Sequence, residues 1–253
     1  MKDIQSLRDN RRINIKKVGV KTISYPITVL DKANSLQHTV AVVNMYVNLP
    51  HHFKGTHMSR FVEILTRIHG EITLRNFRLI LAEMKKRLDA EAAHMEIAFP
   101  YFLQKMPGGN SMVTNRFECK MHGSLDTREE LTLEIKVPIV LPLQNPVSGA
   151  LPASMGQWGR ATVAVRFRTF LWLEDLIGLI EREISLAGGA GSTDSRDAGD
   201  ISVESLTARL GRALAGETAL NWFSVTVENM GAGYSTFATL ERHTHRTAGE
   251  PIP

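Results

Sequence analysis

Residues 18–30 read VGVKTISYPITVL, and residues 38–49 read HTVAVVNMYVNL. Both segments combine β-branched residues with alternating apolar positions, a pattern that predicts two successive strands. The pattern then changes to helical spacing, which predicts a helix between a cap at Thr56 and a stop at Gly70, and a second helix over residues 73–90. The apolar face of the first helix comprises Phe61, Val62, Leu65 and Ile68.

The second half of the chain repeats this order. Strands at residues 93–106 and 112–123 complete a first β-β-α-α-β-β unit. The second unit comprises strands at 131–141 and 161–167, helices at 173–185 and 202–215, and strands at 222–228 and 234–240. We therefore expect a duplicated α+β fold, in which each unit is an antiparallel sheet with its helices on one face. The expected boundaries are a polar segment at 1–14, a first unit at 15–125, a second unit at 126–245 and a tail at 246–253.

The composition excludes several classes of protein. With 43% hydrophobic and 22% charged residues among 253, the chain has the composition of a globular protein. It has no apolar run of about 20 residues. Its first thirteen residues lack the apolar core of a signal peptide, so we expect a cytoplasmic protein that does not bind a membrane. The basic residues are scattered and the net charge is only +4, which argues against nucleic acid as a partner.

Cysteine and histidine limit the possible metal chemistry. Cys119 is the only cysteine, so a disulfide within one chain and a cysteine-rich zinc site are excluded. It lies in the alternating segment NRFECKMHG, residues 115–123, which favours a half-buried side chain over a reactive thiolate. Nine histidines remain as candidate metal ligands.

Residues 49–65, LPHHFKGTHMSRFVEIL, are the most specific string in the chain. Together with residues 18–50, they closely resemble the N-terminal half of the type IB GTP cyclohydrolases, and the similarity continues weakly through FPYFLQK, VPI and TVAV. The resemblance implies a duplicated (bimodular) tunnelling fold, assembled as a homotetramer with active sites between subunits. It also implies a metal-bound water that opens the imidazole ring of GTP, with dihydroneopterin triphosphate as the product.

The chain departs from this family at the metal ligands that the resemblance implies. Aligned on the family's motifs, Leu143, Gln157, Gly231 and Tyr234 occupy the four ligand positions. Leucine and glycine carry no donor atom, and neutral Gln and Tyr are poor ligands for a divalent ion. We therefore expect no metal or other cofactor.

A rival alignment keeps a metal site open. The segment Glu241-Arg-His-Thr-His brings His243 and His245 near the expected ligands at the C-terminal end, although it leaves two family positions unmatched. A divalent metal is expected only under this reading. The alternative is a solvated tail rich in His and Arg.

Glu204 matches one functional residue of the family, a glutamate that anchors the edge of a purine or pterin ring. It lies in ISVESL, residues 201–206, directly after a helix cap at Ser202. A carboxylate can accept from two adjacent N–H groups of such a ring. A solvated glutamate that the helix dipole favours explains the same residues without a ligand.

The segment KGTHMSR, residues 54–60, joins a strand to a helix start. Lys54, Thr56 and Arg60 are candidate anion-binding residues there, because free N–H groups and positive charge attract a phosphate. His51, His52 and His57 are candidates for catalysis or for stabilising a subunit junction. The Gly-, Ser- and Asp-rich segment at residues 186–200 is expected to be a mobile loop, which can also close over a ligand.

The sequence leads to three hypotheses of function. The first is a diverged, metal-independent enzyme of pterin metabolism that binds a purine or pterin as a homo-oligomer. The second is an authentic metal-dependent GTP cyclohydrolase with rearranged ligands. The third is a non-catalytic paralogue that binds the same class of ligand.

Overall fold

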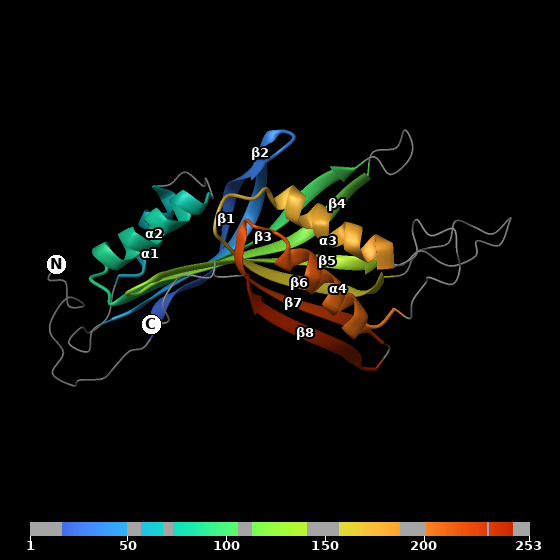
Figure 1. Cartoon of the computed structure of the whole chain (residues 1–253). Coiled ribbons are helices and arrows are strands. Elements are labelled where there is room, and N and C mark those ends of the chain that lie inside the picture. Colours follow the sequence, from blue (N-terminus) through green and yellow to red (C-terminus); the bar gives the residue numbers. More distant parts are fainter. Residues whose placement is uncertain are drawn as a thin grey trace, which may run out of the picture. The chain divides into compact units, whose positions relative to one another are not determined.

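The structure is a computed structural model, and it describes residues 17–49, 57–67, 73–105, 113–140, 157–187, 201–231 and 233–244. Its elements, labelled in Figure 1, are β1 (Val18–Asp31), β2 (Ser35–Asn48), α1 (Ser59–Thr66), α2 (Leu74–Arg87), β3 (Ala92–Lys105), β4 (Val113–Leu125), β5 (Glu129–Val140), β6 (Gln157–Phe167), α3 (Leu173–Ala187), α4 (Val203–Ala215), β7 (Leu220–Met230) and β8 (Ser235–His243). Hydrogen-bonded neighbours follow chain order from β1 to β8. This order of elements and the α+β class are those expected from the sequence.

The chain divides into two compact units. Unit 1 falls within residues 1–104 and 118–133, and unit 2 within residues 105–117 and 134–253. No helix among the described residues is long and apolar enough to span a bilayer.

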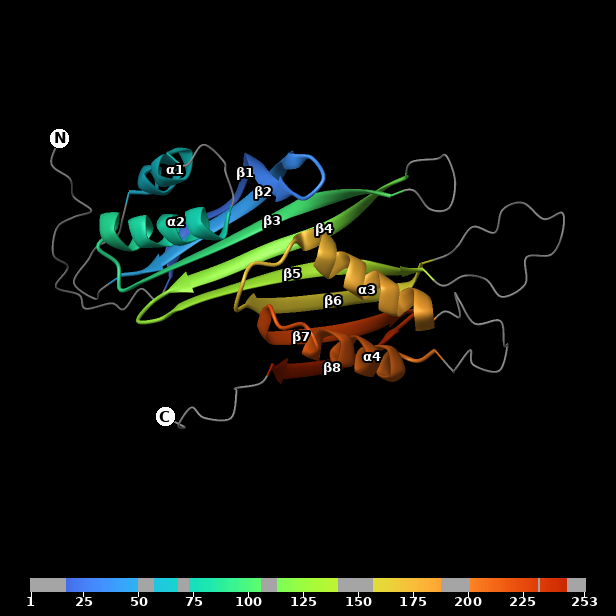
Figure 2. The same cartoon turned by 45° about the horizontal axis from the view of Figure 1, so that its top comes forward.

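In unit 1, the helices α1 and α2 cover one face of the sheet (Figure 2). Strands β2 and β3 are antiparallel and place Met45 opposite Met95 in the register. Both side chains are fully buried, as are Phe61 from α1 and Phe77 from α2. Alternation along the strands therefore supplies one side of this core, and helical spacing supplies the other.

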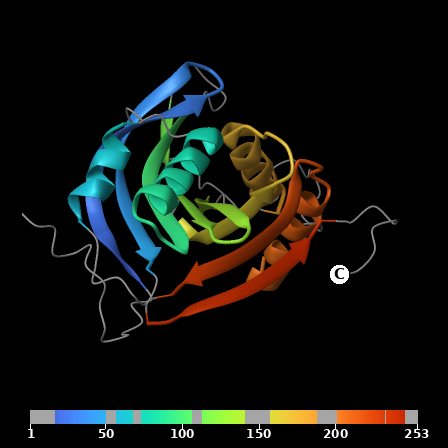
Figure 3. The same cartoon turned by 90° about the vertical axis from the view of Figure 1, so that its left-hand side faces the viewer.

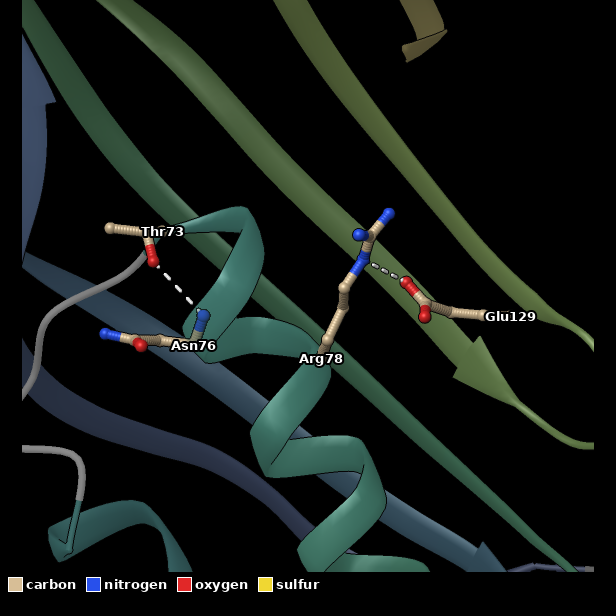
Figure 4. Close-up of polar contacts among 4 residues, drawn as sticks. All are labelled: Thr73, Asn76, Arg78 and Glu129. Carbon is tan, nitrogen blue, oxygen red and sulfur yellow. Dashed lines mark hydrogen bonds and ion pairs between the residues drawn. The ribbon is translucent and has the colours of Figure 1, made fainter. Parts of the chain in front are cut away.

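Polar contacts at the N-terminal end of α2 fix the position of this helix (Figure 4). The Thr73 hydroxyl accepts from the Asn76 backbone N–H at 3.1 Å, which satisfies one of the free N–H groups of the first turn. One turn later, the Arg78 guanidinium forms an ion pair of 2.5 Å with Glu129 at the start of β5. The cap defines where α2 begins, and the ion pair links its exposed side to the sheet.

Unit 2 has a similar layering. Strand β7 lies between β6 and β8 in two antiparallel pairings, and Figure 3 shows β7 and β8 side by side. Val163 and Val225 are opposite each other in the register and fully buried. Helix α4 packs against β7 and β8, with Leu210 and Leu214 fully buried.

Helix α1 differs from the expected helix. It begins at Ser59, and its N-cap residue Met58 makes no side-chain cap hydrogen bond. It ends at Thr66, whereas Thr56 and Gly70, the expected cap and stop, lie outside the described residues. Val62, expected on the apolar face, is 46% exposed. The buried face instead runs through Phe61, Ile64 and Leu65, because Val62 is rotated by about 100° from Phe61 on a helix of 3.6 residues per turn.

Candidate functional site

The start of α4 carries Glu204, the expected ring-edge anchor. Ser202 is the N-cap: its hydroxyl accepts from the Ser205 N–H at 3.1 Å, and the Ser205 hydroxyl accepts from the Ser202 N–H at 3.1 Å. This reciprocal pair satisfies two donors of the first turn and leaves Glu204 exposed beside it. The expected cap at Ser202 is confirmed.

The environment of Glu204 favours its ionised form. The pKa of the carboxyl lies below its ordinary value, first because it is hydrogen-bonded to its own backbone N–H and second because it is hydrogen-bonded to the Ser202 side chain. Negative charge in a first helical turn is also stabilised by the helix dipole. An exposed, ionised carboxylate at this point is able to accept two N–H groups from a flat ring. The same exposure agrees with a solvated helix start, so both readings of Glu204 remain.

The start of α1 carries two of the other candidates. The Arg60 backbone N–H donates to the His57 carbonyl at 3.2 Å, so His57 lies in the turn that precedes α1 and Arg60 in the first turn of the helix. Their side chains are half-buried, and each takes part in a further contact. His51, His52, Lys54 and Thr56 lie outside the described residues. The anion-binding role of this segment therefore stays a prediction.

The positions that the resemblance assigned to metal ligands are only partly described. Gly231 and Tyr234 face each other across the β7–β8 turn, where the Gly231 N–H donates to the Tyr234 carbonyl at 3.0 Å. The Tyr234 side chain is 77% exposed. Gln157 begins β6, and Leu143 lies outside the described residues.

Of the two histidines in the rival alignment, the structure likewise describes only one. His243 is the exposed last residue of β8, while His245 lies outside the described residues. In the described part of the chain, no three His, Cys, Asp or Glu side chains are grouped so that they could hold a metal ion. Most of the expected loop at residues 186–200 also lies outside that part, since α3 continues to Ala187.

Cys119 is buried more deeply than its alternating segment suggested. Its side chain is 2% exposed in the core of unit 1. Burial raises the pKa of the thiol far above its ordinary value, so the nucleophilic thiolate does not form at neutral pH. The expectation that Cys119 has no catalytic role agrees with this environment, but the half-buried position was wrong.

A second group of polar residues was not found from the sequence. It lies on the face of the unit 1 sheet opposite the buried core, where β2 contributes Asn44 and Tyr46, and β3 contributes His94 and Glu96. The register pairs Asn44 with Glu96 and Tyr46 with His94. The sequence signal for this group was alternation. On each strand, the two polar residues are separated by one buried apolar residue, Met45 in β2 and Met95 in β3.

Comparisons with known proteins identify the family. The family model of type I GTP cyclohydrolase folE2 matches residues 1–187. GTP cyclohydrolase FolE2 of Syntrophobacter fumaroxidans is 41% identical over 257 residues, which cover 96% of this chain and 99% of that protein. GTP cyclohydrolase FolE2 of Syntrophotalea carbinolica is 40% identical over 266 residues, which cover 100% of this chain and 99% of that protein.

Solved structures resemble the fold at low sequence identity. Uricase from Arthrobacter globiformis has a TM-score of 0.58 at 8% identity and covers 94% of this chain and 96% of its own. Urate oxidase from Bacillus sp. TB-90 has a TM-score of 0.59 at 8% identity and covers 90% of this chain and 100% of its own. This likeness concerns the fold alone, and the expected tunnelling fold fits it. The match of the family model and the identity to relatives over almost the whole chain show that this protein belongs to the type I GTP cyclohydrolase FolE2 family.

Proposed function

We propose that this protein binds a purine or pterin through Glu204 and is a diverged, type IB-like enzyme of pterin metabolism that works without a metal. Membership of the GTP cyclohydrolase FolE2 family supports a guanine nucleotide or a related ring as the ligand. The observation that carries the proposal is Glu204 itself, an exposed and ionised carboxylate in a capped first helical turn.

The role of Glu204 follows from the shape of the ligand. Guanine and pterin rings both present a ring N–H beside an exocyclic amino group, and a carboxylate accepts these two donors in parallel. Charge-assisted hydrogen bonds of this kind contribute about 1.5–3 kcal/mol each. Because the reciprocal hydrogen bonds between Ser202 and Ser205 fix the helix start, the carboxylate needs little reordering before it binds.

We propose a reaction without a metal because of the side chains at the four positions that the resemblance assigns to metal ligands. Leu143 and Gly231 have no side-chain donor, and Gln157 and Tyr234 are neutral oxygen or nitrogen donors that bind divalent ions weakly. These four residues do not fit the metal that the family resemblance implies. We therefore assign no step of a reaction to a metal ion.

Calorimetry tests ligand binding directly. GTP, guanosine and a reduced pterin should bind the purified protein, and Glu204→Gln should weaken each of them by at least about tenfold. Asp175→Asn is the matched control, since Asp175 is also an exposed carboxylate in the first turn of a helix of unit 2. If Glu204→Gln and Asp175→Asn bind as the parent does, the anchor role is wrong. Metal analysis of the same sample tests the proposal that the protein works without a metal. Stoichiometric, tightly held zinc, manganese or iron would overturn it.

The relatives, which are GTP cyclohydrolases by name, favour a second candidate, an authentic metal-dependent GTP cyclohydrolase. Its ligands would have to come from His243 and His245 or from His51, His52 and His57. Incubation with GTP and Mn²⁺, followed by oxidation, should then produce a fluorescent pterin. Binding with no turnover under any metal would instead identify a non-catalytic paralogue.

We also propose the expected organisation for the assembled protein. Two β-β-α-α-β-β units at residues 15–125 and 126–245 would arise by duplication, and the order of the elements supports this. A homotetramer would bring the α1 segment, with Lys54, Thr56 and Arg60, to a site between subunits as an anion-binding element. Sedimentation analysis checks the assembly, and a monomer at micromolar concentration would contradict it.

A further inference from the structure

The face of the unit 1 sheet opposite its buried core contains a hollow of about 490 Å³ at β1 and β2. We call it the β1–β2 hollow, and its lining comprises Lys17, Val18, Gly19, Lys21, Asn44, Tyr46 and Glu96. Its volume lies in the range of small-molecule sites, roughly 300–1,000 Å³. It does not include Glu204 or any other residue to which a role was assigned above.

The acidic group of the hollow is already neutralised. The Glu96 Oε2 atom accepts from Asn44 Nδ2 at 3.1 Å and lies 3.3 Å from the Lys120 ammonium. Burial alone raises the pKa of Glu96, but the hydrogen bond from Asn44 and the charge of Lys120 outweigh it, so the pKa lies below the ordinary value. Glu96 is therefore an ionised partner of Lys120, and it leaves the other positive charges of the hollow uncompensated.

Two lysines supply those charges. Lys17 places its ammonium 4.7 Å from the centroid of the Tyr46 ring, which is a cation–π contact. Lys21 is exposed and lines the same hollow. Within the described residues, neither ammonium forms an ion pair, and Glu96, the carboxylate that lines the same hollow, lies 3.3 Å from Lys120 instead.

The backbone around the hollow is also unusual. The register of β1 shifts between Val20 and Ile23, and Thr22 within this bulge has a φ of 58°. A threonine in the left-handed region costs about 1–3 kcal/mol and persists only where its surroundings enforce it. The Thr22 N–H donates to Asn44 Oδ1 at 2.8 Å, while Asn44 Nδ2 donates to Glu96. The bulge thus fixes the Asn44 amide between β1 and Glu96.

Two histidines lie near the hollow, and the charge of Lys17 acts on both of them. His94 stacks on Tyr46 with ring centroids 4.9 Å apart, and its buried Nε2 has no hydrogen-bond partner in the described part of the chain. Burial, followed by the charges of Lys17 and His122, lowers the pKa of His94 despite the opposing effect of Asp126. Burial likewise lowers the pKa of His122; Glu96 opposes this, and Lys120 and Lys17 add to it. The charge of Lys17 lowers the pKa of both imidazoles, and an anion in the hollow would offset this charge.

We propose that the β1–β2 hollow binds a phosphate group, whose oxygens accept from the ammonium groups of Lys17 and Lys21. Lys120, paired with Glu96, offsets the negative charge of that carboxylate and so reduces its repulsion of a phosphate. The volume admits a chain of phosphates as well as a single one. The ligand is therefore either an inorganic phosphate or polyphosphate, or the phosphate chain of a nucleotide. The proposal does not rest on Glu204.

Titration calorimetry at constant ionic strength tests the site, with inorganic pyrophosphate, GTP and guanosine as probes. The double variant Lys17→Met/Lys21→Met should lower the affinity for pyrophosphate at least tenfold. Each substitution removes one charge-assisted hydrogen bond, and the loss of one such bond weakens binding by about tenfold. Lys86→Met is the matched control, since Lys86 is an exposed lysine of α2 that does not line the hollow. It should bind pyrophosphate as the parent does.

The probes distinguish the two sources of phosphate. A loss of pyrophosphate and GTP affinity with guanosine unchanged identifies the phosphate chain of a nucleotide, and a loss for pyrophosphate alone identifies a free anion. Either supports the site. The NMR signals of His94 and His122 should shift on addition of pyrophosphate to the parent and not to the double variant. Failure of pyrophosphate to bind the parent, or equal binding by the double variant, overturns the proposal. Glu204→Gln should leave pyrophosphate binding intact, which separates this test from that of the ring-edge anchor.

Discussion

Gly123 in β4 lies where α2 approaches the unit 1 sheet, and its replacement by alanine tests this packing. A Cβ atom at this position would come within 2.3 Å of Phe77 Cε1 and 3.2 Å of Leu81 Cδ1. Phe77 is fully buried, so its ring has no solvent-filled space into which it can turn. Overpacking a closed core costs about 1–3 kcal/mol. We expect Gly123→Ala to lower the free energy of unfolding by an amount in this range.

Urea denaturation followed by circular dichroism measures the effect. With a slope of about 2 kcal/mol per molar urea, a loss of about 2 kcal/mol lowers the midpoint by about 1 M. Gly178→Ala in α3 is the control of opposite sign. A Cβ there meets no heavy atom within 4 Å, and alanine in a helix is more stable than glycine by roughly 0.5–1 kcal/mol. A Gly123→Ala midpoint at or above that of the parent would refute the close approach of α2 to β4. If the Gly123→Ala midpoint falls, adding Phe77→Leu to the same chain should restore part of the lost stability.

Three further predictions concern local environments. Iodoacetamide should not alkylate Cys119 in the native protein at pH 8 and should do so in urea, because burial raises the pKa of this thiol and blocks access to it; rapid native labelling seen by mass spectrometry would contradict this. Ser202→Ala should lower the free energy of unfolding by about 1 kcal/mol through loss of the α4 cap, and an unchanged urea midpoint would speak against the cap. The pKa of His94 is lowered in the folded state. Below pH 6.5, the ordinary pKa of this side chain, the unfolded chain therefore binds more protons than the folded chain. Stability should therefore fall as the pH drops from 7 to 5, and His94→Gln should weaken this dependence in urea titrations at both pH values.

Local patterns were sufficient for the order of the elements. Alternating apolar residues in β1 and β2 and helical spacing in α2 were visible in the sequence, because each depends on neighbours a few positions away. The cap at Ser202 was visible for the same reason, and with it the place of Glu204 in a first turn. The depth of Cys119 and the exposure of Val62 were not, since burial depends on what packs against an element.

The candidate sites also have a part that the sequence predicts and a part that only the folded structure creates. Sequence alone determined the class of the fold and the helix start that carries Glu204, because these follow from residue identity and short spacing. Only the tertiary structure brought Lys17, Asn44 and Glu96 together, since Lys17 directly precedes β1, Asn44 lies in β2 and Glu96 lies in β3. Strand register decides which side chains meet across a sheet, and it is set by long-range pairing and by the bulge in β1. The β1–β2 hollow is therefore a property of the folded chain that no single segment contains.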